Sequence, residues 1–378
     1  MRAAGPDSDL VATTKWGEIY RDIGVKPVIN AAGNIAVLGG PPVSPVVRAA
    51  MDTADEAFAP LEKLQERAGA LIAQMLGVEG TYLSAGAGAA IVLSTEACMA
   101  GAGQRKIHQV PDVTGINNRF LLQKRQRHLV DRCLTLAGGQ IVEFGDDDGT
   151  TEEQLESALG SCTAAVYCRI DEGHLDARIL TLRQVIRIAH RRSVPVIVDA
   201  ADQVFPIENL SKYARWGADL VAYGGMHFGA PDTTGLLVGS RDMIRKATIY
   251  GQVRHAACRR EIIGLVVALR EWLAMDHEAR LADLERRGQV VCRHLSGIPG
   301  VRASLVSATA GSSANSVRIE VDPVETRRTA AEVVRLLKDG DPAIWTTHVN
   351  GMMTVRVNQL APGQDEIVGR RLSAVFRA

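Results

Sequence analysis

The chain has 378 residues, which is too long for one ordinary compact domain and predicts a large domain with a smaller one. Apolar residues make up 46% and charged residues 23%, so a sizeable core can form and wholesale disorder is excluded. The 43 basic and 43 acidic residues leave no net charge, which excludes a global attraction to nucleic acid or anionic membrane.

The N-terminal residues and the cysteines favour a cytoplasmic protein. No uninterrupted apolar run approaches the roughly 20 residues that span a bilayer, and residues 1–16 lack the apolar core of a signal peptide. The six cysteines form no CxxC pair, so we expect neither a metal site nor a disulfide framework. A reduced, cytoplasmic location is the simplest interpretation.

Helical and strand patterns alternate through the first two thirds of the chain. Apolar residues recur at helical spacing from Leu61 to Met75, and a short strand pattern over 81–84 follows. Later apolar runs predict buried strands at 120–122, 141–144, 164–168, 194–198, 220–223 and 236–238. A helical pattern over 182–189 lies among them. Strands that alternate with helices predict a mainly parallel α/β sheet.

A long helical pattern over about residues 260–290 predicts a bridge to a smaller C-terminal α/β domain. The expected elements of that domain are strands over 316–321 and 353–357 and helices over 330–338 and 365–375. We therefore expect four parts, namely an N-terminal segment (1–50), a large domain (51–258), a bridging helix (259–290) and a small domain (291–378).

Small residues occupy the turn between the strand at 81–84 and the next helix. Gly86, Ala87 and Gly88 would let the backbone approach a ligand, and the helix that follows offers unpaired N–H groups to an anion such as phosphate. Tight packing of a strand on a helix requires small residues equally. Taken alone, the turn favours this packing explanation.

The strand Val194–Val198 ends in Asp199, at the carboxyl end where open α/β sheets bind ligands. A buried carboxylate there requires a partner, because an isolated charge in the interior is very costly. A protonated pyridine nitrogen is one such partner. The other explanation, equally good on these residues alone, is that Asp199 caps the next turn.

The segment 219–239 is the most specific in the chain. A strand enters a glycine turn at Gly224–Gly225, crosses a polar loop and returns as a second strand. So much glycine around one loop indicates close approach to a ligand.

Together, the Asp199 strand, the glycine turn about twenty residues later and the G-x-P-x-x-x-G loop 229–235 resemble one family. It is the selenocysteine-synthase-like group of fold-type-I pyridoxal-phosphate enzymes, the group of L-seryl-tRNA(Sec) selenium transferase and D-glucosaminate-6-phosphate ammonia-lyase. The resemblance covers about residues 25–375, and its further motifs are Val28–Gly33, Leu38–Gly40, Pro111–Gly115, Glu261–Leu265, Val355–Asn358 and Pro362–Gly363.

The resemblance implies a fold-type-I large domain and an enzyme that binds pyridoxal 5'-phosphate. Its substrate would be a small molecule, an α-amino acid, and the chemistry would occur at Cα through an external aldimine and a carbanion, ending in elimination. Asp199 would bind the pyridinium nitrogen, Gly86, Ala87 and Gly88 would lie along the phosphate, and Gly225 would border the cofactor. The family also implies a homodimer or a higher homo-oligomer.

Other roles carried over by the resemblance have ordinary alternatives. Thr233 and Thr234 can donate hydroxyls to a phosphate, which can belong to a neighbouring subunit; a plain turn is the alternative, and it is favoured for Thr234. Arg356 can bind a substrate carboxylate bidentately, or it can form an interdomain ion pair. Asn30 and Asn34 can reach the substrate from the N-terminal segment, or they can cap loops.

Two histidines are candidates for the cofactor site. His128 maps near the segment that covers the cofactor ring in the family, although residues 126–128 depart from the family pattern. His227 has a side chain whose usual pKa suits an acid or base, and it lies next to position 226. A lone histidine is more often structural, so each has a structural alternative.

Position 226 is where this chain departs from the family. Five residues before Pro231 the family has the lysine that forms a Schiff base with the cofactor; here it is Met226, and none of the eight lysines lies in this turn. Methionine is similar in length but can neither form the Schiff base nor move the Cα proton. An engineered Lys→Met change that traps a bound aldimine and a natural loss of the lysine both explain this, and the otherwise intact site favours the first.

Three other functions stay open beside elimination. The scaffold also suits an oxygen-using amino-acid decarboxylase that forms a carboxamide in nucleoside-antibiotic biosynthesis, and oxygen consumption would distinguish it. Selenium transfer on seryl-tRNA is disfavoured, because a tRNA binder requires a basic surface. A catalytically dead binding protein is the non-enzymatic alternative.

Overall fold

The computed structural model describes residues 19–20, 22–100, 103–172, 176–254, 257–306 and 316–378, and it divides into two units. Unit 2 is Gly40–Ala274, and unit 1 combines Met1–Gly39 with Met275–Ala378. In the described part of the chain, no helix is long and apolar enough to cross a membrane.

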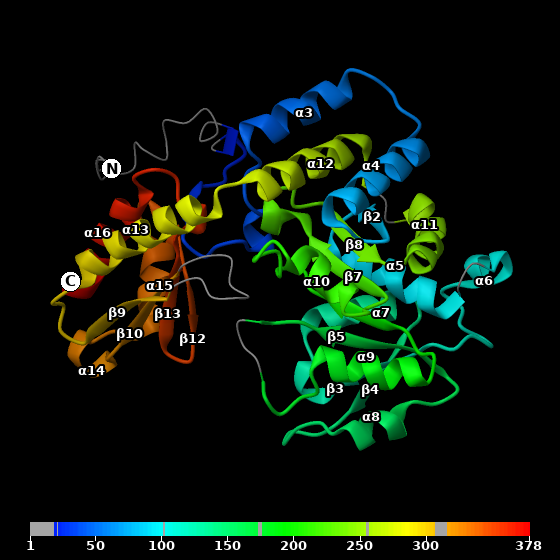
Figure 1. Ribbon diagram of the computed structural model, residues 1–378. Helices are drawn as coiled ribbons and strands as arrows, with labels where there is room; N and C mark the ends of the chain where they lie inside the picture. Colours follow the sequence, from blue (N-terminus) through cyan, green and yellow to red (C-terminus); the bar gives the residue numbers. More distant parts are fainter. Residues whose placement is uncertain (1–18, 21, 101–102, 173–175, 255–256, 307–315) are drawn as a thin grey trace. The chain divides into compact units, whose positions relative to one another are not determined.

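Unit 2 is built on a seven-stranded sheet with the order β2-β8-β7-β6-β5-β3-β4 (Figure 1). Its strands are β2 (Gly80–Ser84), β3 (Arg119–Gln123), β4 (Gln140–Phe144), β5 (Thr163–Arg169), β6 (Val196–Asp199), β7 (Leu220–Gly224) and β8 (Gly235–Gly239). Only β8 runs antiparallel to its neighbours. The reversal follows from the short loop 225–234, because a parallel connection needs a longer crossover. The predicted mainly parallel α/β sheet is confirmed.

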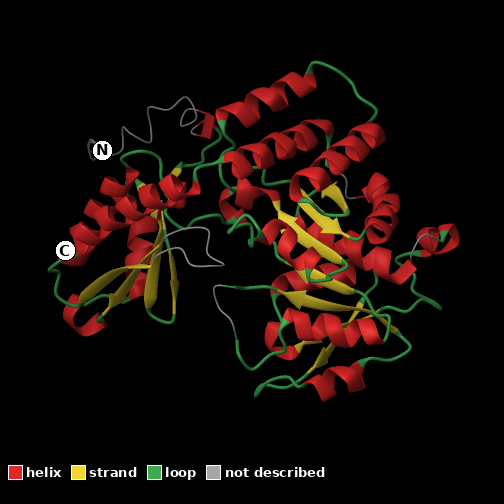
Figure 2. Ribbon diagram, in the orientation of Figure 1, coloured by secondary structure: helices red, strands yellow, loops and turns green. Residues whose placement is uncertain are grey.

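Helices cover both faces of this sheet (Figure 2). The α-helices of unit 2 are α3 (Pro45–Asp55), α4 (Leu61–Leu76), α5 (Ala87–Ala100), α6 (Gln104–Gln109), α7 (Cys133–Leu136), α8 (Glu152–Ala158), α9 (Leu182–Arg191), α10 (Asn209–Arg215), α11 (Arg241–Arg254) and α12 (Arg259–Ala274). Three 3-10 helices accompany them: η2 (Lys124–Gln126), η3 (Leu129–Arg132) and η4 (Gly225–Phe228).

Alternate residues of each central strand point into two separate cores. In β6, Val196 and Val198 belong to the core that also holds residues of α3, α4, α9, α10 and α12, whereas Ile197 belongs to the core with α5, α7 and α11. Because both faces are buried, these strands are continuous apolar runs. Asp199 follows the same alternation as Ile197 and therefore lies on the α5 and α7 face.

Unit 1 holds a four-stranded antiparallel sheet of order β12-β13-β10-β9 and a parallel pair, β1 with β11. The strands are β1 (Val28–Asn30), β9 (Val301–Val306), β10 (Ser316–Val321), β11 (Ala343–Trp345), β12 (Thr347–Val349) and β13 (Met352–Arg356). The helices are η1 (Ala36–Leu38), α13 (His277–Leu295), α14 (Pro323–Thr326), α15 (Ala330–Lys338), η5 (Val357–Gln359) and α16 (Gln364–Arg377).

Two divisions of the chain differ from the expected ones. The described N-terminal residues do not form a segment of their own, because β1 pairs with β11 and Ile29 is buried in the core of unit 1. Where one bridging helix was expected over 259–290, the structure has α12 and α13. Asp276 separates them, because its side chain accepts a hydrogen bond from the Ala279 N–H and so begins a new helix.

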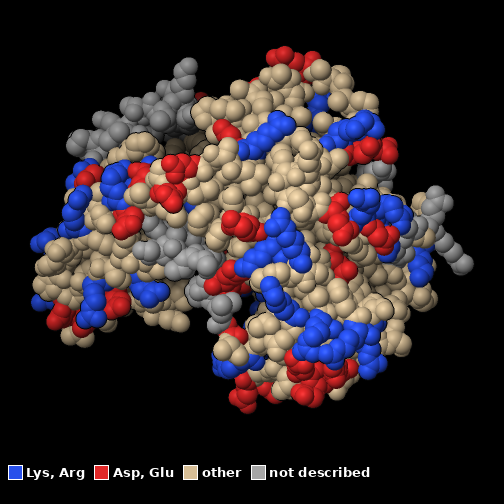
Figure 3. Space-filling view, viewed as in Figure 1, with Lys and Arg blue, Asp and Glu red and all other residues tan. Residues whose placement is uncertain are grey.

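The charges on the visible face of unit 2 are mixed in sign (Figure 3). Basic side chains of α9 pair with acidic ones of α8, as Arg191 does with Glu156 at 3.3 Å. This face of unit 2 therefore presents alternating charge and no continuous basic surface.

Candidate functional site

The carboxyl ends of β2, β6 and β7 lie along one edge of the unit 2 sheet. Gly235 pairs with Ser84 of β2 on one side and with Gly224 of β7 on the other. Asp199 pairs with Ala222 of β7. The fold thus brings the small-residue turn, the aspartate and the glycine turn to the edge where α/β sheets bind ligands.

The turn after β2 leads into the N-terminus of α5. Gly86 has a φ of +98°, and a Cβ placed on it would meet no atom within 4 Å. The Ser84 hydroxyl donates to the Gly86 carbonyl at 2.9 Å, and that carbonyl accepts the Ala90 N–H at 3.1 Å. The N–H groups of Ala87 and Gly88 belong to the first helical turn, where no carbonyl of the helix can accept them. The geometry and polarity of this turn suit an anion.

Asp199 is buried, with 4% of its surface exposed. It accepts hydrogen bonds from the Tyr167 hydroxyl at 3.0 Å and from the Ala201 N–H at 3.1 Å. Burial raises the pKa of Asp199, while these two hydrogen bonds and the charge of Arg169 oppose the rise. Among the described residues no cation is within ion-pair distance of it, so a ligand cation is what this carboxylate lacks.

Two side chains that the sequence did not single out line the same edge. A Cβ on Gly88 would lie 3.4 Å from the Cys133 Sγ. Burial raises the pKa of the Cys133 thiol, and the nearby charge of Asp199 raises it further. Cys133 therefore lies near both the α5 turn and Asp199. Strand alternation could have revealed Tyr167, but a lone cysteine gives no signal in the sequence.

The turn after β7 is closed by backbone contacts. The Gly224 N–H donates to the Ala201 carbonyl at 2.9 Å, and the Gly225 N–H donates to the Thr234 carbonyl at 2.8 Å. A Cβ on Gly225 would collide with the Thr234 hydroxyl, so this position requires glycine. The next residue, Met226, is half-buried in η4.

The His227 ring packs against Gly224. Its Cδ2 lies 3.0 Å from the place of a Cβ on Gly224. Burial lowers the pKa of His227, and the charges of Asp202 and Asp232 oppose this shift. His227 is therefore a neutral base at pH 7 with negative charge nearby.

Three predicted cofactor ligands make local contacts. Thr234 is fully buried, and its hydroxyl donates to the Pro231 carbonyl at 2.6 Å. Thr233 is exposed and donates to Glu261. His128 is exposed and caps η3, where its Nδ1 accepts the Val130 N–H at 3.4 Å. All three have the contacts that the plain-turn and structural explanations require.

The three predicted substrate ligands are in unit 1. Asn30 closes a turn, since its amide donates to the Gly33 carbonyl at 3.0 Å and accepts the Ala32 and Gly33 N–H groups. The Asn34 Oδ1 accepts the side-chain amide of Asn358 at 3.0 Å. Arg356 packs its aliphatic part on Gly33, with Cδ 2.6 Å from the place of a Cβ. Arg356 is exposed and has no ion pair within the described residues, so it can still bind an anion.

No described lysine is available in the turn after β7. Lys212 of α10 pairs with Glu172, and Lys338 lies over the Trp345 ring at 4.1 Å. Four others pair with carboxylates: Lys26 with Asp341, Lys63 with Glu66, Lys124 with Asp147 and Lys246 with Asp242. Lys106 lies in α6, and Lys15 lies outside the described residues.

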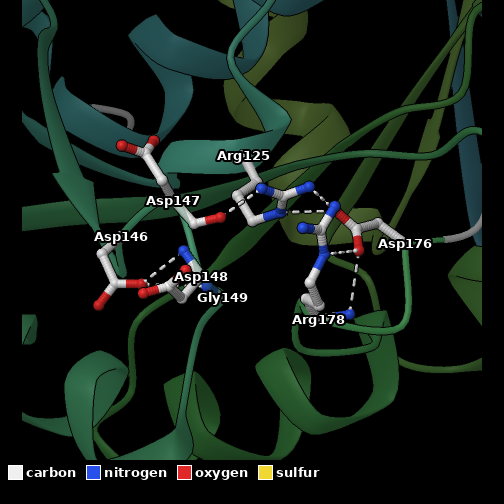
Figure 4. Close-up of polar contacts among 7 residues, drawn as sticks. All are labelled: Arg125, Asp146, Asp147, Asp148, Gly149, Asp176 and Arg178. Atoms are coloured by element: carbon white, nitrogen blue, oxygen red, sulfur yellow. Dashed lines mark hydrogen bonds and ion pairs between the residues drawn. The ribbon is translucent and has the colours of Figure 1, made fainter.

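The loop after β5 leaves the same edge of the sheet and is held by arginines (Figure 4). The Arg125 Nε donates to Asp176 at 2.6 Å, and the Arg178 Nε donates to the other oxygen of Asp176 at 3.0 Å. Arg125 also donates to the Asp147 carbonyl. The hydrogen bonds from Arg178 are the main reason that the pKa of Asp176 is lowered to about 2.

Within the residues that the structure describes, no group of three or more His, Cys, Asp or Glu side chains is placed to hold a metal ion. The six cysteines are free thiols.

Comparison with known proteins identifies relatives along almost the whole chain. No family model matches the sequence. The chain is 31% identical over 372 residues to 5'-C-glycyluridine monooxygenase-decarboxylase of Streptomyces sp., covering 94% of this chain and 92% of the relative. It is 29% identical over 370 residues to D-glucosaminate-6-phosphate ammonia lyase of Salmonella typhimurium, covering 94% of this chain and 97% of the relative.

A solved structure supports the same grouping. The structure of D-glucosaminate-6-phosphate ammonia-lyase superposes with a TM-score of 0.83 at 28% identity, covering 95% of this chain and 98% of that chain. The chain belongs to the selenocysteine-synthase-like group of fold-type-I pyridoxal-phosphate enzymes.

Proposed function

We propose that this chain binds pyridoxal 5'-phosphate at the carboxyl edge of the unit 2 sheet and that its chemistry is elimination at Cα of an α-amino acid. The observation that carries the proposal is Asp199. It is a buried carboxylate with no cation partner among the described residues, and it lies on the face of the sheet covered by α5. A protonated pyridine nitrogen satisfies that carboxylate.

The residues at this edge fit the phosphate and the ring of the cofactor. The N–H groups of the first turn of α5 would bind the phosphate, with open space above Gly86. Asp199 would bind the ring nitrogen, and Cys133 would contact the ring between these two points. Met226 does not fit the aldehyde, because a thioether has no amine to offer.

The roles of the protein groups follow from their contacts. When bound, the cofactor supplies a protonated ring that withdraws electrons from the substrate Cα. Asp199 holds the proton on the ring nitrogen, and the Tyr167 hydroxyl fixes the orientation of that carboxylate. His227 is neutral because burial lowers its pKa, so its ring can accept a proton. Met226 can hold no proton, so the chain as given should turn over very slowly or not at all.

Arg356 is our choice for the group that binds the substrate carboxylate. A guanidinium binds a carboxylate through two parallel hydrogen bonds, and Arg356 is exposed and without an ion pair in the described residues. Arg356→Lys keeps the charge and loses the paired geometry. In the Met226→Lys background, it should therefore raise KM more than it lowers kcat.

Oxygen-using decarboxylation is the second candidate. It is favoured by the relative in Streptomyces, a monooxygenase-decarboxylase, whose identity of 31% is no lower than the 29% of the ammonia lyase. Elimination consumes no oxygen, whereas the second reaction consumes it with each turnover. An oxygen electrode on the lysine-restored variant with candidate amino acids distinguishes the two.

The proposal is tested at position 226. Met226→Lys should attach the cofactor covalently and give an absorbance band in the visible, and borohydride should fix the label on residue 226. Met226→Gln, which has a similar length and no amine, is the matched control and should give no covalent label. Labelling of another lysine, or of none, in the Lys variant would show that this turn is wrongly aligned with the family.

A further inference from the structure

The last residue of β5 is an arginine that lies on the same face of the sheet as Asp199. Arg169 is the register partner of Asp199, so the two residues are neighbours across adjacent parallel strands. Side chains alternate along a strand, and Arg169 therefore points to the same face as Tyr167, whose hydroxyl donates to Asp199. This is the face that α5 and α7 cover. An arginine thus stands beside the carboxylate that we assign to the ring nitrogen.

The guanidinium of Arg169 lacks a hydrogen-bond acceptor. Among the described residues its only charged partner is Asp171, with Nη1 3.8 Å from Oδ2, which is too long for a hydrogen bond. The Arg169 side chain is 31% exposed. Its charge also acts on Asp199, because it opposes the rise in the pKa of that carboxyl that burial causes. A largely buried group with five N–H donors and no acceptor calls for an acceptor in the ligand.

The chemistry of the cofactor decides which of its atoms faces this arginine. In pyridoxal 5'-phosphate, the phosphate arm and the phenolic oxygen lie on opposite sides of the axis that joins the ring nitrogen to the 4' carbon. The proposed phosphate position is the turn before α5, where Gly86 packs against Gly235 of β8. Asp199 of β6 takes the nitrogen, and β5 lies on the side of β6 away from β8. The ring edge that carries the phenolic oxygen therefore faces β5.

We propose that Arg169 binds the phenolic oxygen of the cofactor in its ionised form. The inference rests on the proposed function, because that function supplies the positions of the phosphate and the nitrogen. A guanidinium is always charged and donates strong hydrogen bonds to an oxyanion. Asp199 and Arg169 then act on the ring together, with the carboxylate beside the positive nitrogen and the guanidinium beside the negative oxygen. The pair keeps the ring in the dipolar form that withdraws electrons from the substrate.

The experiment uses pyridoxine 5'-phosphate, which has the phenolic oxygen but no aldehyde, so that Met226 does not enter its binding to the full chain. Near-ultraviolet absorbance of the bound compound, followed against pH, gives the pKa of its phenol. Arg169→Gln should raise this pKa by about one unit or more, because a nearby cation favours the anion. Arg169→Gln should also weaken binding about tenfold. Arg169→Lys keeps the charge and should recover most of the pKa difference.

Arg119→Gln is the matched control. Arg119 is an exposed arginine at the amino end of β3, the end opposite to the proposed site, and its loss should change neither the phenol pKa nor the affinity. Circular dichroism checks that the Arg169 variants fold. If the phenol has the same pKa in Arg169→Gln as in the parent, the inference is refuted while the cofactor site stands.

A second compound, 3-O-methylpyridoxine 5'-phosphate, cannot ionise at this oxygen and separates the remaining outcomes. Arg169→Gln should leave its affinity unchanged, because the contact that the substitution removes is already missing. If Arg169→Gln weakens both compounds equally, Arg169 contacts another part of the cofactor and the assignment to the phenolic oxygen is wrong. If neither compound binds the parent, the proposed function fails together with the inference.

Discussion

Asp199 and Tyr167 form a buried pair in which each residue has a separate task. The carboxylate is the partner that we propose for the cofactor's ring nitrogen, and the hydroxyl fixes one of its oxygens at 3.0 Å. An amide at position 199 keeps the shape but cannot hold a proton on a pyridine nitrogen. Substitution of one residue or the other therefore separates loss of the carboxylate's charge from loss of its fixed orientation.

Asp199→Asn should leave the fold intact and weaken cofactor binding. Loss of a charged hydrogen bond costs about 1.5–3 kcal/mol, which is roughly 10- to 100-fold in affinity. Tyr167→Phe should cost less, about 0.5–1.5 kcal/mol, because the carboxylate remains. Calorimetry measures affinity, and circular dichroism controls for folding. Near-normal turnover of Asp199→Asn in the Met226→Lys background would contradict the assigned role of Asp199.

A single residue of the site could be predicted from the sequence when it lies next to a recognisable strand in the chain. Asp199 and the glycine turn lie next to recognisable strands, so their place at the carboxyl edge follows from the chain order. Tyr167 and Cys133 come to that edge from neighbouring elements, and no spacing along the chain reveals such a meeting. The predicted cofactor roles of His128 and Thr234 remain predictions, and both side chains have local partners, a helix N-terminus and the Pro231 carbonyl.

At the scale of elements, Arg125 ties the loops after β3, β4 and β5 together, because it donates to the Asp147 carbonyl and to Asp176. The folded-state pKa of Asp176, about 2, lies below the ordinary value of 3.8 because Arg178 and Arg125 donate hydrogen bonds to it. A lowered pKa means that the ionised carboxylate stabilises the fold above pH 4. That contribution disappears as the pH falls from about 4 to about 2.

Asp176→Asn should destabilise unit 2 modestly at neutral pH, and the difference from the parent should vanish on acidification. Urea unfolding at pH 6, 4 and 3 measures it. Asp148→Asn is the control, because the Asp148 carboxylate accepts no hydrogen bond from the residues that the structure describes, and the variant should match the parent at each pH. If the difference in unfolding free energy between Asp176→Asn and the parent stays constant with pH, the charge of the Asp176 carboxylate does not contribute to the stability of the loop.

Elements were predictable where burial gave them a continuous pattern. The strands of unit 2 are buried on both faces, and the apolar runs found six of them together with the strand before the α5 turn. The strands that the sequence did not reveal are short or half-exposed. β1 and β11 have three residues each, and β9 alternates between exposed and partly buried positions. Their pairing comes from tertiary contacts, which local patterns do not contain.

At the scale of the whole molecule, we expect a homodimer or a higher symmetric oligomer. Large apolar side chains are exposed in unit 2, including Val46 at 58% and Phe58 at 94%, and such surface is typical of a protein interface. Sedimentation velocity at micromolar concentration should show a species of at least twice the 40.6 kDa chain. Phe58→Ser should weaken the assembly, and a monomer as the only parent species would refute the expectation.

The single reversed strand, β8, also sets the order in which the site can be assembled during synthesis. Among the described strands, β2 has β8 as its only sheet neighbour, and about 150 residues of chain separate the two. Until the ribosome has released residue 239, β2 lacks its partner strand β8, and the turn before α5 lacks the packing contact with Gly235. A nascent chain stalled before β8 should therefore hold the other strands of the sheet yet fail to retain a phosphorylated pyridine. Ligand binding would then report the completed insertion of one strand.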